Sequence, residues 1–462
     1  MYRRVAKIII PLMMSCFLLW SIITYTYAAY RAGFDAEGAL RLNPSNTSAL
    51  QVLSNRVLAQ EKSFGSDKMD AGRLGDFAQL PADSTPQVAD QKAHSSDAGL
   101  QISANSKLTR EEVIEQGRLW SVALLRANPL SAVALANLGL FASGDAAMTE
   151  RFMEAAARRS LRQRIAIYWM MRHSFDAGSL PQALTYADSL LRLSQRDIEL
   201  VAPILGHVAE NEASSQAFIE LLKTNPRWRA AFFRQIKGSF TDARTPLSLF
   251  LELKESANPP STGELKSYID VLMAAKLYDL AYNTWLQFLP VEELKVAGFV
   301  FDGGFEFPSK GMPFEWKVAQ GKGVTSSTIR IDNDPALKFE FSGARIAPAL
   351  ASQTTMLMPG DYVLSGRYQG QVHARRGLRW IVRCSSKPQA LAEGKIIPLT
   401  NTWQTFELPF TVPKQDCRAQ SIELEIEARS ASDTMLTGAM SLDTISLRRQ
   451  RVDPAASPSS NE

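Results

Sequence analysis

Two arginines on alternate positions of one predicted strand are the clearest candidates for binding chemistry in this sequence. Residues 378–384 read Leu-Arg-Trp-Ile-Val-Arg-Cys, and the two-residue period of a strand places Arg379, Ile381 and Arg383 on one face. A row of guanidinium groups can hold the carboxylates of an acidic polymer through paired hydrogen bonds. The same row could equally be the solvated outer face of a sheet.

Residues for catalysis or metal chemistry are scarce. The chain has 4 His and 3 Cys, with no Cys-x-x-Cys and no His-Glu-x-x-His, so we expect no zinc site. It also lacks Gly-x-Gly-x-x-Gly, a Walker loop and Gly-x-Ser-x-Gly. No pair of acidic residues stands in a recognisable glycosidase motif. We therefore expect a protein without enzymatic activity.

Length and composition describe an ordinary globular protein of several domains. A chain of 462 residues corresponds to two to four domains at roughly 100–200 residues each. With 45% hydrophobic and 21% charged residues, collagen-like, coiled-coil and wholly disordered chains are excluded. A net charge of +4 excludes a nucleic-acid binder that depends on a strongly basic field.

The first thirty residues have the pattern of a membrane anchor. Arg3, Arg4 and Lys7 precede an uncharged run, residues 8–29, whose 22 residues match the ~20 that a bilayer core requires. Cations before the run predict a cytoplasmic N-terminus and an exported remainder. A cleaved signal peptide, or a lipoprotein acylated at Cys16, are the alternatives.

Export also bears on the two remaining cysteines, Cys384 and Cys417. An even pair in an exported domain predicts a disulfide. Two buried free thiols are the alternative.

Helical periodicity runs through residues 31–60 and 108–290, broken by a polar segment. Helix-ending signals recur at Asn128-Pro129, Ser160, Ser194 and Asn225-Pro226. Their spacings of about 32, 34 and 31 residues lie close to the 34 of the tetratricopeptide repeat. The string A-L-R-L-N-P-S-N-T-S-A-L, residues 39–50, resembles a junction between such repeats. Residues 61–107 between the two helical parts are too polar to form a core, so we expect disorder there.

The sequence pattern changes near Val296, where short runs of alternating apolar and polar residues replace helical periodicity. Seven such runs, separated by Gly, Pro, Asn and Asp clusters, are predicted as strands: 328–331, 337–341, 362–368, 378–384, 405–409, 422–428 and 440–447. Seven or more short strands predict an antiparallel sandwich. The expected organisation is therefore α + β and multidomain: 1–30 cytoplasmic stub and transmembrane anchor, 31–60 first helix pair, 61–107 linker, 108–290 helical repeats, 296–450 β-sandwich and 451–462 disordered tail.

Several sequence segments in the predicted sandwich resemble those of carbohydrate-binding modules of the galactose-binding-like jelly-roll type. F-D-G-G-F-E at 301–306 resembles their opening, and M-P-G-D-Y-V-L-S-G-R-Y at 358–368 resembles a turn and its following strand. W-Q-T-F-E-L-P-F-T-V-P at 403–413 resembles a late strand of the same modules. The resemblance implies a jelly roll and, more weakly, sugar binding.

Sugar binding by such a module would need an exposed aromatic ring to stack on a pyranose face. The candidates are Trp380, Trp403 and Tyr368, together with Arg379 and Arg383 as polar partners. Core packing explains any one of the rings equally well. The resemblance also implies a structural calcium ion held by Glu306 and Asp443, because those positions carry calcium ligands in some modules. Two surface carboxylates are the alternative.

Anchor, repeats and jelly roll together resemble the tetratricopeptide-repeat proteins of bacterial exopolysaccharide and capsule systems. That resemblance implies an inner-membrane scaffold for polymer assembly or export, with repeats that bind a protein partner and a sandwich that contacts polysaccharide or protein. A protein-assembly factor that binds no glycan and a glycan-modifying enzyme are the alternatives.

Overall fold

The computed structural model describes residues 2–64, 109–142, 144–387, 389–396 and 399–450; at residues 2–12, 61–64 and 399 it describes the backbone alone. Most of the predicted linker and the tail 451–462 lie outside the described residues. The chain divides into two compact units, residues 1–241 and residues 242–462.

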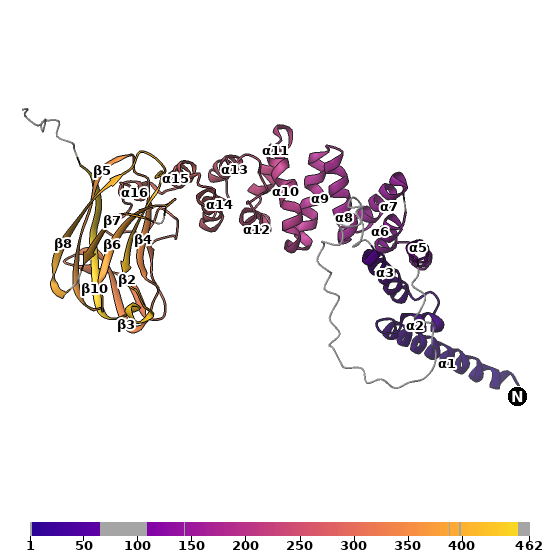
Figure 1. Cartoon of the computed structure of the whole chain (residues 1–462). Helices are drawn as coiled ribbons and strands as arrows, with labels where there is room; N and C mark the ends of the chain where they lie inside the picture. Colours follow the sequence, from indigo (N-terminus) through magenta and orange to yellow (C-terminus); the bar gives the residue numbers. More distant parts are fainter. Residues whose placement is uncertain (1, 65–108, 143, 388, 397–398, 451–462) are drawn as a thin grey trace, which may run out of the picture. The chain divides into compact units, whose positions relative to one another are not determined.

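The first unit is helical (Figure 1). The predicted ends at Asn128, Ser160 and Ser194 are confirmed, because each is the residue that caps the end of a helix. The assignment to the tetratricopeptide repeat stays a prediction. The helices are α1 (Tyr2–Arg31), α2 (Ala36–Leu42), α3 (Thr47–Phe64), α5 (Arg110–Ala127), α6 (Ala132–Leu140), α7 (Ala146–Arg159), α8 (Arg164–Asp176), α9 (Leu180–Leu193), α10 (Ile198–Glu210), α11 (Glu212–Lys223) and α12 (Arg229–Arg234).

The N-terminal helix α1 covers the residues that were predicted to cross a membrane. In the part of the chain that the structure describes, no helix combines the length and apolar character that a bilayer crossing requires. The predicted run, residues 8–29, begins on residues whose side chains lie outside the described ones.

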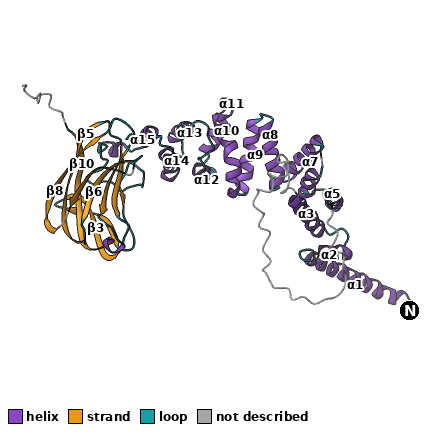
Figure 2. Ribbon diagram, in the orientation of Figure 1, coloured by secondary structure: helices purple, strands orange, loops and turns teal. Residues whose placement is uncertain are grey.

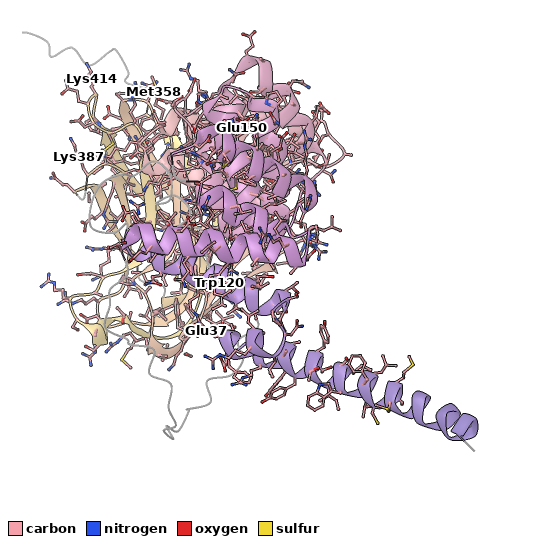
Figure 3. The ribbon with its side chains drawn as sticks, turned by 90° about the vertical axis from the view of Figure 1, so that its right-hand side faces the viewer. Glu37, Trp120, Glu150, Met358, Lys387 and Lys414 are labelled. Atoms are coloured by element: carbon pink, nitrogen blue, oxygen red, sulfur yellow. A yellow bond between two sulfur atoms is a disulfide. The ribbon has the colours of Figure 1, made fainter. Side chains whose placement is uncertain are left out.

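Helix α3 packs against α5 although more than forty residues separate them in the chain. Ser54 and Ser121 lie within hydrogen-bonding distance of each other, at 2.7 Å between their buried hydroxyls. The amide of Asn137 on α6 donates to Ser54 at 2.8 Å. Trp120, labelled in Figure 3, packs against the small buried clusters on both sides of this contact. The first helix pair therefore belongs to the same unit as the later helices.

The second unit joins four helices to a sandwich of strands (Figure 2). Its helices are α13 (Thr245–Lys254), α14 (Thr262–Ala274), α15 (Tyr278–Gln287) and α16 (Val291–Leu294). Lys276, at the turn between α14 and α15, has a φ of 60°. Trp285 of α15 packs on the rings of Phe301 and Phe314 at 5.0 and 5.5 Å. This aromatic contact attaches the helices to the sandwich.

The sandwich consists of two five-stranded antiparallel sheets, in the orders β1-β4-β9-β6-β7 and β2-β3-β10-β5-β8. The predicted antiparallel sandwich is confirmed. The strands are β1 (Lys317–Val318), β2 (Val324–Ile331), β3 (Asp334–Arg345), β4 (Ala349–Thr355), β5 (Gly360–His373), β6 (Leu378–Cys384), β7 (Ala390–Ile396), β8 (Leu399–Val412), β9 (Gln420–Ile426) and β10 (Met435–Arg449).

One apolar core fills the space between the sheets. It is built from inward residues of both sheets, including Phe339, Leu364, Trp380 and Leu424. Cys384 and Cys417 are joined by a disulfide, with Cα atoms 5.0 Å apart. The predicted disulfide is confirmed, and it ties the end of β6 to the loop before β9.

Candidate functional site

The structure separates the five residues that were predicted to bind a glycan into three places. Trp380 and Tyr368 lie in the core between the sheets. Trp403 lies on the outer face of the β2-β3-β10-β5-β8 sheet, and Arg379 and Arg383 lie on the outer face of the other sheet. A single glycan site therefore cannot contain all five residues.

The prediction for Trp380 and Tyr368 is wrong. Trp380 is 0% exposed and stacks on Phe406, with ring centroids 5.5 Å apart. Tyr368 is also buried and contacts the same ring of Phe406 at 6.4 Å. The alternation of β5 and β6 points both side chains inward, where core packing takes the whole ring and leaves no face for a sugar.

The arginine row of β6 lies on one face, as its alternation predicts, but glutamates neutralise it. Arg379 pairs with Glu425 at 2.6 Å and with Glu393 at 2.8 Å. Arg383 pairs with Glu423 at 2.8 Å. The guanidinium groups therefore already have carboxylate partners from β7 and β9, and the row is not a free basic surface for an acidic polymer.

The proposed calcium ligands also have other roles. The carboxylate of Asp443 accepts a hydrogen bond from Nε of Arg367 at 2.8 Å. Glu306 is exposed, and its backbone N–H donates to Asp302 at 2.8 Å. Among the described residues, no group of three or more His, Cys, Asp or Glu could hold a metal ion.

Trp403 is the predicted residue that lies where a ligand could reach it. It is half-buried on β8, beside β5 at the edge of its sheet. The guanidinium carbon of Arg367 lies 4.8 Å from the ring centroid of Trp403. The contact is a cation–π interaction, which holds the indole against the sheet. One aromatic face is thereby fixed in position on the outer surface.

Arg367 is held in turn by two carboxylates. It lies directly across the sheet from Asp443 of β10, and its Nη2 also lies 3.1 Å from Asp334. The hydrogen bond to Asp443 raises the pKa of Arg367. The guanidinium therefore stays charged and fixed, which makes it a rigid support for Trp403.

Polar side chains continue across the outer face from this cluster. The strand register places Ser441 of β10 between Lys338 of β3 and Gln369 of β5, and Ser327 of β2 beyond Lys338. Thr405 of β8 lies opposite Arg367. Ser441 itself is only 6% exposed. We call the half-buried and exposed members of this set the polar strip: Ser327, Lys338, Gln369, Arg367, Thr405 and Trp403. The aromatic ring can stack on the face of a sugar, and the hydroxyl, amide and ammonium groups beside it can form hydrogen bonds with the sugar hydroxyls.

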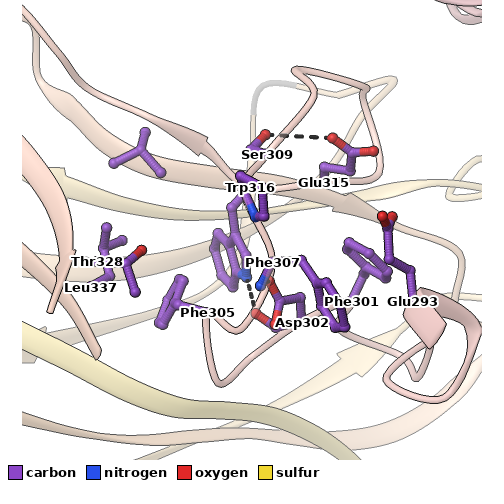
Figure 4. Close-up of a pocket in the computed structure, with 12 residues that line it drawn as sticks. Glu293, Phe301, Asp302, Phe305, Phe307, Ser309, Glu315, Trp316, Thr328 and Leu337 are labelled. Atoms are coloured by element: carbon purple, nitrogen blue, oxygen red, sulfur yellow. Dashed lines mark hydrogen bonds between the residues drawn. The ribbon is translucent and has the colours of Figure 1, made fainter. Parts of the chain in front are cut away.

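The chain also has a small pocket beside the opening motif of the sandwich (Figure 4). Trp316 forms its wall and donates its indole N–H to the carbonyl oxygen of Asp302 at 3.0 Å. Its remaining lining residues are Glu293, Phe301, Asp302, Phe305, Phe307, Pro308, Ser309, Glu315, Val318, Thr328 and Leu337.

Each carboxylate of this pocket already has donors. Asp302 accepts the backbone N–H groups of Glu306 and Phe307 at 2.8 and 3.0 Å, and burial raises the pKa of the Asp302 carboxyl. Glu315 accepts the backbone N–H of Lys310 at 2.6 Å. Lys310 also pairs with Glu293 at 2.6 Å. These bonds hold the loop in shape, so the pocket's acids have a structural role.

Sequence reasoning did not identify Arg367 as the residue that positions Trp403. The alternation of residues 362–368 contains the signal, because it places Ser365 and Arg367 outward when Leu364, Gly366 and Tyr368 point inward. The pairing with Asp443, 76 residues away, has no local signal.

No family model and no curated protein matches the chain. A solved structure titled "CBM4 structure and function" is similar to 33% of this chain over 99% of its own length, with 16% identity and a TM-score of 0.26. The structure of a module called TmCBM61, in complex with β-1,4-galactotriose, is similar to 33% of this chain over 99% of its own length, with 15% identity and a TM-score of 0.23.

An enzyme has a comparable likeness. A cyclase from Fischerella sp. TAU covers 32% of this chain and 92% of its own, at 12% identity and a TM-score of 0.22. Likeness at these values says nothing about function. The sandwich is established by its own strand pairing, and its function has to be argued from its side chains.

Proposed function

We propose that the protein is a non-catalytic adaptor whose sandwich holds a glycan on the polar strip, while its helices hold a protein partner. One observation carries the glycan proposal. Trp285, Trp316 and Trp380 are all buried in the second unit, whereas Trp403 lies on an outer sheet face. Its ring is supported by Arg367 and has hydrogen-bonding side chains along one side.

The non-catalytic role is supported by the hydrogen bonds and ion pair that the carboxylates of this unit already make. Glycoside hydrolysis needs two carboxylates placed on either side of the scissile bond. Asp302 and Glu315 are each used to hold backbone N–H groups of their own loop. Asp443 is paired with Arg367. In the described residues of this unit, these acids serve the fold.

The proposed compartment is the bacterial periplasm, with residues 8–29 as an inner-membrane anchor and exopolysaccharide assembly or export as the process served. It is supported by the cations Arg3, Arg4 and Lys7 before an uncharged run, and by the disulfide, a bond typical of exported proteins. Alkaline carbonate extraction of membranes tests the anchor. Release of the protein into the soluble fraction would favour a cleaved signal peptide.

Affinity electrophoresis tests glycan binding directly. The full chain is run through gels that contain the source organism's own exopolysaccharide, with a neutral glucan gel as the reference. We expect retardation by the native polymer and its loss in Trp403→Ala. Phe299→Ala is the matched control, because Phe299 is an exposed ring (44%) of the same unit outside the polar strip.

The result separates the alternatives. Retardation that persists in Trp403→Ala but disappears in Arg379→Gln/Arg383→Gln would show that the glycan binds on the opposite sheet. Equal mobility in every gel would remove glycan binding and leave the protein-assembly role as the remaining function.

A further inference from the structure

The turns that join one helix pair of the first unit to the next lie side by side along one edge. They are residues 128–131, 160–163, 194–197 and 225–228. Three contacts join each turn to the next: Arg159 to the Pro129 carbonyl, Arg164 to Asp197 at 2.6 Å, and Gln195 to the Arg227 carbonyl at 3.0 Å. We call this row the turn edge.

Basic residues are concentrated on the turn edge and in the helix ends that flank it. The segments 124–131, 156–164, 190–199 and 221–229 hold ten Arg or Lys and two acidic residues. Three of these cations pair with acids just outside the segments: Arg158 with Glu154, Arg192 with Asp188 and Lys223 with Glu220. The turns at the other end of the same helices have the opposite composition. Segments 141–146, 175–180 and 208–213 hold four acidic residues and no basic one.

Helix dipoles account for part of this asymmetry, but not for all of it. Arg126, Arg159 and Arg192 lie in the last turns of α5, α7 and α9, where a cation is favoured by roughly 0.3–1 kcal/mol. Arg162 lies in the turn before α8, and Arg196 lies in the three-residue 3-10 helix Gln195–Asp197, so neither is in the last turn of an α-helix. Their charge therefore has no explanation in helix stability.

Several of these arginines have no role in holding the fold. Arg158 and Arg192 pair with acids of their own helices, and Arg164 is buried against Asp197. The side chains of four exposed arginines make no hydrogen bond or ion pair with other described residues: Arg126, Arg162, Arg196 and Arg227. One such guanidinium stands at each of the four turns.

Exposed leucines accompany the arginines. Leu130, Leu161 and Leu193 are 76%, 59% and 39% exposed, each at a different turn of the edge. An apolar side chain at this exposure gains free energy when a partner covers it. Three of the four turns thus combine one exposed guanidinium with one exposed leucine, and the turn at 225–228 has the guanidinium alone.

We propose that the turn edge binds an acidic segment of a partner protein, in which apolar side chains alternate with carboxylates. This inference rests on the proposed adaptor role of the helices and is independent of glycan binding by the sandwich. Side-chain contacts join each turn of the edge to the next. An extended peptide advances about 3.3 Å per residue, so one segment of moderate length can reach several neighbouring turns.

The chemistry of the edge favours a peptide over the other polyanions. A polysaccharide has no apolar side chains to cover three leucines. A lipid surface is continuous and gives no reason for one arginine at each turn. A peptide supplies both carboxylates and apolar groups along one chain.

Fluorescence anisotropy with the full chain tests the proposal. The probe is a labelled peptide of about 18 residues built from Glu-Leu-Glu repeats, long enough for several turns. Arg126→Gln/Arg162→Gln/Arg196→Gln/Arg227→Gln should weaken its binding about tenfold or more, since each ion pair contributes modestly. The matched control removes four exposed basic residues elsewhere in the unit: Arg56→Gln/Arg151→Gln/Arg234→Gln/Lys237→Gln.

A second variant separates the apolar part. Leu130→Ser/Leu161→Ser/Leu193→Ser should weaken binding of the Glu-Leu-Glu peptide and leave an all-Glu peptide unaffected. Equal losses in the arginine variant and its control would show non-specific attraction and overturn the proposal. So would binding to phosphatidylglycerol vesicles or to hyaluronate without binding to the peptide. Trp403→Ala should bind the peptide normally, which separates this result from a failure of the glycan site.

Discussion

Arg367 and Asp443 lie opposite each other on β5 and β10, with Nε of the arginine 2.8 Å from the carboxylate. The same guanidinium lies over the ring of Trp403 on the neighbouring strand β8. An ion pair on one strand pair thereby positions an aromatic ring on the next. This relationship makes the outer face of the sheet a defined surface and not a set of independent side chains.

Breaking this ion pair should destabilise the sandwich. Asp443 is 3% exposed, so Arg367→Gln would leave a buried carboxylate without its counter-ion. Because the Arg367 side chain is itself 32% exposed, we expect a loss of about 2 kcal/mol in the free energy of unfolding, less than for a fully buried pair. Urea denaturation of the full chain, followed by tryptophan fluorescence, measures this loss.

The matched control for Arg367→Gln is Arg448→Gln, which removes an exposed pair with Glu407. We expect this change to cost less than about 0.5 kcal/mol. Equal losses in the two variants would show that Asp443 gains nothing from its partner.

The disulfide should contribute more than any single contact of the sandwich. Cys384 and Cys417 close a loop with a sequence separation of 33 residues, for which the chain-entropy model gives about 3–4 kcal/mol. Cys384→Ala/Cys417→Ala should lower the unfolding free energy by that amount in urea denaturation. Cys16→Ser, which removes the exposed free cysteine, should change nothing. A double variant as stable as the native chain would contradict the prediction.

The buried polar cluster of the helical unit should control how firmly α3 is docked. The amide of Asn137 donates to Ser54 at 2.8 Å and to Asn55 at 3.1 Å. Asn137→Ala removes both bonds and should cost about 1–3 kcal/mol. Hydrogen exchange should then be faster in the amides of α3 than in those of α9. Asn55→Ala is the control, with a smaller effect expected because Asn55 is exposed.

Acid should weaken the sandwich through two carboxylates. Hydrogen bonding by Lys395 lowers the pKa of Glu427 below 4.5, and the backbone N–H of Arg429 lowers the pKa of Asp433 below 3.8. The folded state then binds fewer protons than the unfolded state, so their stabilisation is present above these values and lost as the pH falls through the folded pKa values.

Urea midpoints measured at neutral pH and stepwise below pH 4.5 test this dependence. Glu427→Gln/Asp433→Asn should flatten the fall in midpoint. A double variant with the same slope as the native chain would assign the acid sensitivity to other groups.

Strand prediction succeeded where residue type and alternation agree. Residues 378–384 and 422–428 were predicted as strands, and β6 and β9 occupy these positions with small shifts at their ends. β4 and β7 were missed. Their sequences, Ala-Leu-Ala-Ser-Gln-Thr-Thr and Ala-Leu-Ala-Glu-Gly-Lys-Ile, have few large β-branched or aromatic residues. They become strands because a neighbouring strand in the sheet satisfies their backbone hydrogen bonds.

The candidate site was predictable only in part for a related reason. A strand period tells which residues share a face, and it grouped Arg379 with Arg383 correctly. It does not tell which of the two faces is covered by the other sheet. Trp380 and Trp403 are both tryptophans on predicted strands, yet one is in the core and the other is on the outer surface.

Three helix ends, the alternation of the strands and the pairing of two cysteines were predictable, because these depend on local backbone preferences and on a small number of reactive groups. The packing of the strands, in contrast, places glutamates of β9 on the arginines of β6 and Arg367 against Trp403 on an outer face. Such contacts join residues tens of positions apart, and their register is set by how two sheets pack on one core.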